Sequence, residues 1–301
     1  MLRIGIASLA ATILSLSVIG CGGGASEKPK ITAKPSQGSE EASGAAAEVE
    51  TESAAPAAVA EGIGGLKGRI VLTGGEKSLP PLVEKGDMAV KDAAVCAAET
   101  IADQSIVTGE NGGLANVFVY LERAPKGADI PAASADPVVF DQKGCVFIPH
   151  VLSVRAGQTI KVISDDAIAH NTHTFPVRNV SFNTVISPND RDGVPLVYEQ
   201  PEKIPVQVKC DIHPWMVAYH MPLDHPFVAV TAADGTFEIK DLPSGEHTFR
   251  VWHEKAGYLD RAYKVVVKPD TTVEVELSYG ADALAKFEGN RPKVIQLKSS
   301  R

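Results

Sequence analysis

Three side chains that bind soft metal ions stand three residues apart in the stretch CDIHPWM at 210–216. Cys210 offers a thiolate, His213 an imidazole and Met216 a thioether, and Pro214 stiffens the loop between the last two. Zinc sites prefer several cysteines or histidines in a tetrahedral array, whereas one thiolate, two imidazoles and a weak axial methionine are the ligands of an electron-transfer copper centre. The loop therefore predicts a copper site that still needs one histidine.

The residues before this loop, 204–209, alternate between apolar and polar side chains. In a strand this alternation places Val206, Val208 and Cys210 on one face, so we expect the Cys210 thiolate to point into the domain. The alternative is an ordinary buried cysteine beside an incidental histidine.

The second imidazole is expected upstream, where residues 166–175 contain His170 and His173. An odd separation on an extended strand sends two side chains to opposite faces, so only one of them is expected to reach the metal. Spacing alone does not decide which of the two histidines binds the metal.

Together, HNTHTF at 170–175 and CDIHPWM at 210–216 resemble the cupredoxin family, most closely its amicyanin and plastocyanin members. The resemblance covers about residues 137–224, and the segment 147–162 is similar to the family's early strands. The resemblance favours His170, the histidine that is followed by Asn, as the upstream copper ligand. It also implies a Greek-key β-sandwich at 135–225. The implied ligands of one type 1 copper ion are His170, Cys210, His213 and Met216.

The N-terminus has the pattern of an exported lipoprotein. Residues 1–20 carry Arg3 and then an apolar run too short for a comfortable membrane span, which predicts a signal peptide. The residues before Cys21 resemble the bacterial lipobox, which implies lipid on the Cys21 thiol; a plain signal peptide or an uncleaved anchor is the alternative. Residues 21–63 offer little to bury, so we expect a disordered tether and a location in the cell envelope, on the periplasmic or extracellular face.

The charge of the chain limits its partners. A net charge of −8 gives no electrostatic support for binding nucleic acid or anionic lipid, so we expect membrane contact through the lipid anchor only. The composition, 44% hydrophobic and 22% charged, is that of an ordinary globular protein.

Four cysteines are present, and two remain once Cys21 and Cys210 are assigned. In an oxidising compartment Cys96 and Cys145 are expected to form a disulfide, the alternative being two free buried thiols.

Strand patterns also flank the copper segment. Residues 66–72 and 114–121 are two expected strands, and 227–277 contains five more, the first two joined by the hairpin turn Asp234-Gly235. The sequence ADGTFEIKDLPSGEHTFRVWHE at 233–254 resembles the carboxypeptidase regulatory-like, or transthyretin-like, β-sandwich. We expect an all-β chain whose cupredoxin-like sandwich is inserted between two parts, 64–124 and 226–280, of a transthyretin- or Ig-like sandwich. Two tandem sandwiches are the alternative; short helices are expected within 90–102 and 281–288, the latter in a C-terminal tail at 281–301.

The sequence contains no nucleophile elbow, phosphate-binding glycine loop or HExxH motif, and four protein ligands leave no open copper position for a substrate. We therefore expect a single-electron carrier rather than an enzyme. A redox protein is expected to dock near His213, Pro214 and Trp215, where the imidazole edge emerges through an apolar ring; alternatively Trp215 fills the core.

Two other functions stay open. One is a cell-surface binding module, for example for carbohydrate, with a structural or vestigial copper site. The other is copper storage or delivery, for which Met221 is the only spare methionine near the site. A second copper site, if one exists, is expected around Trp252, His253 and Glu254.

Overall fold

The computed structural model describes residues 62–74, 79–284 and 293–296. The expected signal peptide, the lipidated Cys21, nearly all of the tether and most of the C-terminal tail lie outside these residues. Within the described ranges no helix is long and apolar enough to cross a membrane.

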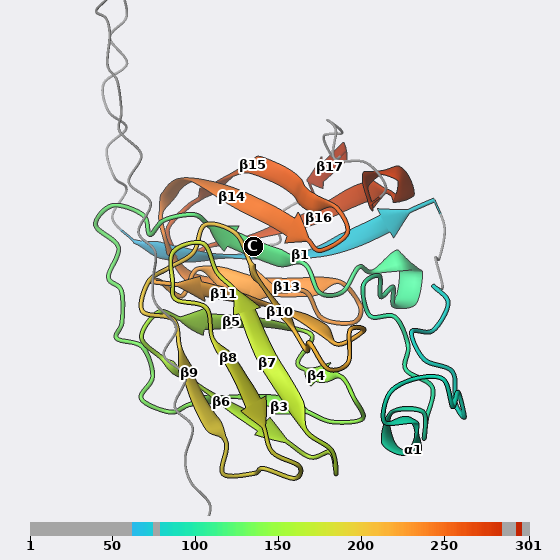
Figure 1. The fold of residues 1–301 in the computed structure, drawn as a ribbon. Helices are drawn as coiled ribbons and strands as arrows, with labels where there is room; N and C mark the ends of the chain where they lie inside the picture. The colour runs from blue at the N-terminus through green and yellow to red at the C-terminus, as the bar shows by residue number, and fades with distance from the viewer. Residues whose placement is uncertain (1–61, 75–78, 285–292, 297–301) are drawn as a thin grey trace, which may run out of the picture. The chain divides into compact units, whose positions relative to one another are not determined.

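The described chain is almost entirely β-structure, as the alternating patterns predict (Figure 1). Three short helical turns are present: α1 (Ala93–Cys96), η1 (Glu110–Gly112) and η2 (Ala281–Leu284). The strands are β1 (Ile63–Thr73), β2 (Phe118–Leu121), β3 (Val138–Gln142), β4 (Phe147–Ile148), β5 (Val151–Arg155), β6 (Thr159–Ser164), β7 (His170–Phe175), β8 (Asn183–Ile186), β9 (Val194–Val197), β10 (Val206–Lys209), β11 (Val217–Leu223), β12 (Val228–Val230), β13 (Thr236–Pro243), β14 (Gly245–His253), β15 (Gly257–Val267), β16 (Thr272–Gly280) and β17 (Lys293–Gln296).

Strands β3 to β11 form two sheets, which we call the central sandwich. One has the order β4-β3-β6-β9, and the other the order β5-β11-β10-β7-β8. Parallel pairs (β3 with β6, β5 with β11) lie among antiparallel ones, because strands that are not consecutive in the chain become neighbours. The expected fold class, an all-β chain with a Greek-key sandwich, is confirmed.

The remaining strands form two further sheets, which we call the outer sandwich. Their orders are β13-β1-β16-β17 and β12-β2-β14-β15. Strands β2 and β12 pair antiparallel, with Tyr120 opposite Val228. The chain therefore leaves the outer sandwich after β2, builds the whole central sandwich, and returns at the strand beside the one it left.

Each sandwich has its own apolar core. Tyr120, Met221 and Trp252 belong to a third buried cluster, drawn from β2, β5, β11 and β14, which joins the two sandwiches. The Tyr120 hydroxyl adds a hydrogen bond of 3.0 Å to the carbonyl of Lys203.

The segment 79–105 contributes to the core of the central sandwich, although the sequence pattern assigns it to the outer one. Val83, Cys96, Ala97 and Ile101 are buried with the side chains of β3, β6 and β10. The expected helix within 90–102 is only the four-residue α1. This segment is held in place by its buried side chains and by the Cys96–Cys145 disulfide rather than by regular secondary structure.

Two other expectations are corrected at the edges of strands. Strand β2 begins at Phe118 rather than at residue 114, because the Leu114 amide donates to the Ile70 carbonyl and Leu114 forms an isolated bridge with Thr108. The turn at Asp234-Gly235 does not close the expected hairpin, because β12 pairs with β2 and β13 pairs with β1, so the two strands lie in different sheets. The turn itself needs Gly235: its φ is +81°, and a Cβ there would come within 2.3 Å of the Ile70 carbonyl oxygen.

Candidate metal centre

Neighbouring strands bring the predicted ligands together. His170 opens β7, and β10 pairs directly with β7. Cys210 follows the last residue of β10, so its inward direction continues the alternation of Val206 and Val208, both of which are buried. His213 lies in the tight turn between β10 and β11, which closes with a hydrogen bond of 2.9 Å from the Met216 amide to the His213 carbonyl.

His170, Cys210 and His213 form a compact group. A ligand atom from each lies within 4.8 Å of the others, and none of the three side chains is accessible to solvent by more than 2%. The two Nδ1 atoms are 2.9 Å apart, and His213 Nδ1 is 3.8 Å from the Cys210 sulfur. The His213 amide also donates to that sulfur at 3.4 Å.

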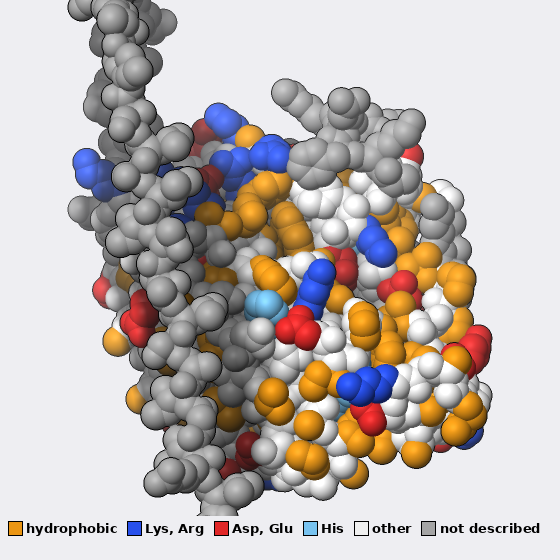
Figure 2. Space-filling model, viewed as in Figure 1, with side chains coloured by type: hydrophobic (Ala, Val, Ile, Leu, Met, Phe, Trp, Pro, Cys, Tyr) orange, Lys and Arg blue, Asp and Glu red, His pale blue; other side chains and the backbone are white. Residues whose placement is uncertain are grey.

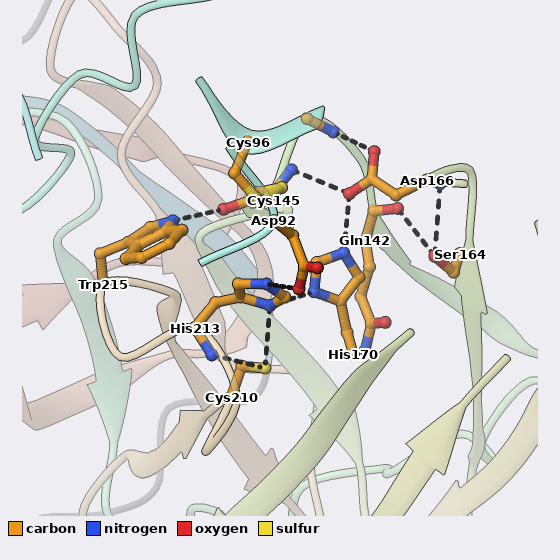
Figure 3. Close-up of a disulfide and its surroundings, with 11 residues drawn as sticks. Asp92, Cys96, Gln142, Cys145, Ser164, Asp166, His170, Cys210, His213 and Trp215 are labelled. Atoms are coloured by element: carbon orange, nitrogen blue, oxygen red, sulfur yellow. Dashed lines mark hydrogen bonds and ion pairs between the residues drawn. A yellow bond between two sulfur atoms is a disulfide. The ribbon is translucent and has the colours of Figure 1, made fainter. Parts of the chain in front are cut away.

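A carboxylate faces the far nitrogen of each imidazole (Figure 3). Asp166 Oδ2 lies 2.8 Å from His170 Nε2, and Asp92 Oδ2 lies 3.0 Å from His213 Nε2. A carboxylate only accepts, so each ring keeps a proton on Nε2 and presents Nδ1 to the thiolate.

These contacts shift the titration of the group. Burial raises the pKa of the Cys210 thiol, but hydrogen bonds from His170 and from backbone amides outweigh it and lower the pKa overall. Burial lowers the pKa of His170, yet Asp166 and the Cys210 sulfur together raise it to about 9. The pKa of His213 stays lowered, mainly by burial and also by the charge of His170, although Asp92 opposes both.

The donor set fits a cation. With a proton on each Nε2, the two Nδ1 atoms and the sulfur would present three lone pairs to one point, which is unfavourable unless a proton or a metal ion lies among them. The raised pKa of His170 and the lowered pKa of Cys210 correspond to the first case, in which a proton lies among these three atoms. A soft or borderline metal ion would replace that proton.

Met216, the fourth predicted ligand, is buried to 1% exposure in the core of the central sandwich. Its carbonyl accepts a hydrogen bond of 3.2 Å from the Cys210 amide, so Met216 is tied to the same turn as the other ligands of the loop.

Asn171 fastens the two ligand-bearing segments together. Its Oδ1 accepts from the Asp211 amide at 2.7 Å, and its Nδ2 donates to Asp211 Oδ2 at 2.8 Å. Because Asn171 follows His170 and Asp211 follows Cys210, this pair of hydrogen bonds fixes the spacing between imidazole and thiolate.

His173 lies outside the group. Its Nδ1 is 3.0 Å from Asp211 Oδ2, and its side chain is partly exposed. The odd separation from His170 thus places the two rings on opposite faces of β7.

A disulfide joins Cys96 to Cys145, with their Cα atoms 5.3 Å apart. The backbone of Cys145 makes two hydrogen bonds to residues around the site. Its amide donates to Asp166 Oδ2 at 2.8 Å, and its carbonyl accepts from Trp215 Nε1 at 3.1 Å. Its sulfur lies within 4.8 Å of ligand atoms of Asp166 and His170, but it is committed to the disulfide.

His213 is fully buried, contrary to the expectation that its imidazole edge emerges at the surface. The physical reason is Asp92: the segment 79–105 lies over the loop and its carboxylate meets the ring. Trp215 is half-buried, and Asp211 and Pro214 are the exposed residues of the loop.

The remaining histidines do not add a metal site in the part of the chain that is described. His150 pairs with Glu254, and neither they nor His253 belong to a group of three potential ligands. His253 is fully buried, and this burial is the main reason that its pKa falls to about 4.

Sequence reasoning missed the roles of Asp92 and Asp166. Asp166 stands four residues before His170, a spacing that could have drawn attention to it. Asp92 is 121 residues from His213, and no local pattern points to it.

No protein-family model matches the chain, and no curated protein matches it. Among solved structures, it is similar to a copper-containing nitrite reductase from Thermus scotoductus, with 21% identity and a TM-score of 0.27 over 33% of this chain; it spans only 25% of that enzyme. It is also similar to a purple cupredoxin from Nitrosopumilus maritimus (20% identity, TM-score 0.24, 28% of this chain and 98% of that one). A variant of amicyanin in its reduced state matches at 18% identity and a TM-score of 0.26, over 31% of this chain and 96% of that one. One sheet of the central sandwich, β5-β11-β10-β7-β8, carries His170 on β7 and Cys210 and His213 on the loop after β10.

Proposed function

We propose that the protein binds one type 1 copper ion at His170, Cys210, His213 and Met216 and works as a single-electron carrier. The observation that carries the proposal is the convergence of two Nδ1 atoms and one thiolate within 4.8 Å in a fully buried pocket. A mixed set of one thiolate and two imidazoles with a nearby thioether favours copper over zinc. Bound copper would supply the uptake and release of one electron.

The residues around the site keep its geometry fixed. The Asn171–Asp211 pair holds the two ligand segments together, and the two carboxylates hold the two rings. Burial of every ligand excludes water from the metal. A rigid, dry site keeps reorganisation small when the charge changes, which suits an electron carrier better than an enzyme that must bind substrate.

We propose the same domain organisation that the sequence predicts. The central sandwich, about 135–225, is inserted in a carboxypeptidase regulatory-like sandwich built from 64–124 and 226–280, and the sheet orders support this division. Residues 79–105 depart from it, because they pack into the core of the central sandwich. A signal peptide and a lipid on Cys21 would anchor it in the cell envelope through the tether.

A redox partner would dock over the copper loop. With His213 covered by Asp92, the approach nearest the metal is through the exposed Pro214 and the half-buried Trp215. Figure 2 shows one face of the molecule, on which Lys and Arg gather towards the top and hydrophobic side chains are scattered among single charges elsewhere. Pro214→Glu should slow electron exchange with a partner and leave the copper spectrum intact; a bleached spectrum would assign Pro214 to site structure.

The alternative functions have less support. Two cavities on the outer sandwich, of about 600 and 640 Å³, have only His247 and Phe237 as aromatic lining residues, so neither resembles a stacking platform for sugars. Trp252 is buried against Phe118 and Tyr219 between the sandwiches. Copper storage is not favoured either, because Met221 is buried in that same cluster.

The decisive experiment is the visible spectrum of the copper-loaded protein. An intense thiolate-to-copper charge-transfer band should appear in the oxidised form, vanish on reduction, and be absent in Cys210→Ala. A wild-type protein that binds zinc selectively and develops no band with copper would rule out the proposal.

A further inference from the structure

The segment 79–105 meets the metal centre at one side chain, Asp92. Its Oδ2 lies 3.0 Å from Nε2 of His213, the imidazole nitrogen that points away from the thiolate. His213 is completely inaccessible to solvent, whereas the Asp92 side chain is about one third exposed. The carboxylate thus stands between the ring and the solvent.

The backbone holds Asp92 firmly in this position. Its φ of 55° and ψ of 38° are left-handed, a conformation that Asp and Asn tolerate better than most residues. The Asp92 carbonyl accepts from the amides of Val95 at 2.9 Å and Cys96 at 3.0 Å. Cys96 is then bonded covalently to Cys145.

The same disulfide reaches the second carboxylate. The Cys145 amide donates to Asp166, whose Oδ2 faces His170 Nε2 at 2.8 Å. Figure 3 shows the arrangement: Asp92 and Asp166 flank the two imidazoles, and the Cys96–Cys145 bond lies beside them. Each ring therefore has one carboxylate partner, and the covalent link fixes one partner relative to the other.

We propose that Asp92 is a positioning residue for the copper site, a proposal that rests on the function proposed above. Asp92 holds His213 as the Nε2–H tautomer, so that Nδ1 is always the free lone pair. Its negative charge makes that imidazole a stronger donor and stabilises Cu(II) relative to Cu(I). Carboxylates that accept from ligating histidines have this effect in metal sites generally, and losing one commonly costs 10- to 100-fold in metal affinity.

The test uses the full chain with Asp92→Asn and Asp92→Gly. Asn keeps an acceptor and tolerates the left-handed backbone but removes the charge; Gly accepts the backbone geometry and removes the side chain. Glu99→Gln is the matched control, because Glu99 lies on the same segment and pairs only with Lys85 on the surface. It removes the same charge without touching His213.

We expect Asp92→Asn to lower the ratio of Cu(II) to Cu(I) affinity by about tenfold, equivalent to a rise of about 59 mV in a one-electron potential. Asp92→Gly should shift it further, and Glu99→Gln less than twofold. Equal shifts of the potential in Asp92→Asn and Glu99→Gln would mean that the loss of any negative charge causes the effect, and this would contradict the proposal. A wild-type potential in both Asp92 variants, with the copper band intact, would also overturn it.

A second readout does not require copper. Nitrogen-15 NMR of the metal-free protein should show His213 protonated at Nε2, with a mixture of tautomers in Asp92→Gly. If wild-type protein never develops the copper band, the proposed function fails, whereas this tautomer measurement still decides the role of Asp92. Nε2 protonation that persists unchanged in Asp92→Gly would refute the positioning role.

Discussion

His170 Nδ1 and His213 Nδ1 lie 2.9 Å apart although the two residues are 43 positions apart in the chain. Neither ring can rotate to avoid the other, since Asp166 and Asp92 hold the opposite nitrogens. The molecule thus keeps two electron pairs facing each other and the Cys210 sulfur, an arrangement that a bound cation stabilises. The predictions below test what each surrounding residue contributes to it.

The first prediction separates the two histidines of β7. His170→Gln should abolish the copper charge-transfer band, because it removes a donor of the buried group. His173→Gln should keep the band, because His173 contacts Asp211 rather than Cys210. Absorption spectra of the copper-titrated variants check this, and the opposite result would exchange the two assignments.

The second prediction concerns Met216. Met216→Leu should retain copper and colour and raise the reduction potential, because a weak axial donor to Cu(II) is lost. Met221→Leu is the control, since Met221 is equally buried but lies in the cluster between the sandwiches. Voltammetry of both variants measures the effect; equal potentials for Met216→Leu and wild type would limit Met216 to packing.

The third prediction concerns the disulfide. Removing it in Cys96→Ala/Cys145→Ala should lower the free energy of unfolding by about 4 kcal/mol, because the cross-link spans 49 residues and restricts the unfolded chain. Guanidinium unfolding of the metal-free protein measures this. Reduction of the wild-type protein by a dithiol should produce a similar loss, and an unchanged midpoint in both cases would contradict the prediction.

The fourth prediction is acid destabilisation through His220. This ring is fully buried, edge-on to Phe140, and burial lowers its pKa to about 3, against about 6.5 in an unfolded chain. Between these values the unfolded state binds one more proton than the folded state. His220 therefore gives its full contribution to stability above pH 6.5, and below that the free energy of unfolding should fall by up to about 1.4 kcal/mol per pH unit.

Unfolding of metal-free protein between pH 7 and 5 checks this effect. His220→Gln should show a shallower loss of stability than wild type, and His173→Gln, a partly exposed histidine, should keep the wild-type slope. Identical slopes for all three proteins would assign the acid sensitivity to other groups, among them His253.

Local sequence was sufficient for the loop that carries three of the proposed ligands. Cys210, His213 and Met216 lie within seven residues, so strand alternation and one tight turn position them with little help from the rest of the fold. The same is true of His170 and His173, whose opposite directions follow from the two-residue period of a strand. The turn at Asp234-Gly235 also follows from its own residues, although the strands that it joins, β12 and β13, lie in different sheets.

Only the tertiary structure decided what surrounds those ligands. The pairing of β7 with β10 brings His170 to Cys210, and the packing of segment 79–105 into the central core brings Asp92 to His213 across 121 residues. Such contacts are selected by burial and chain crossing over long separations, and no period in the local sequence encodes them. The sequence by itself thus determined the chemistry of the donor set, whereas the fold decided that His213 is enclosed, because a carboxylate from a distant, disulfide-anchored segment closes over it.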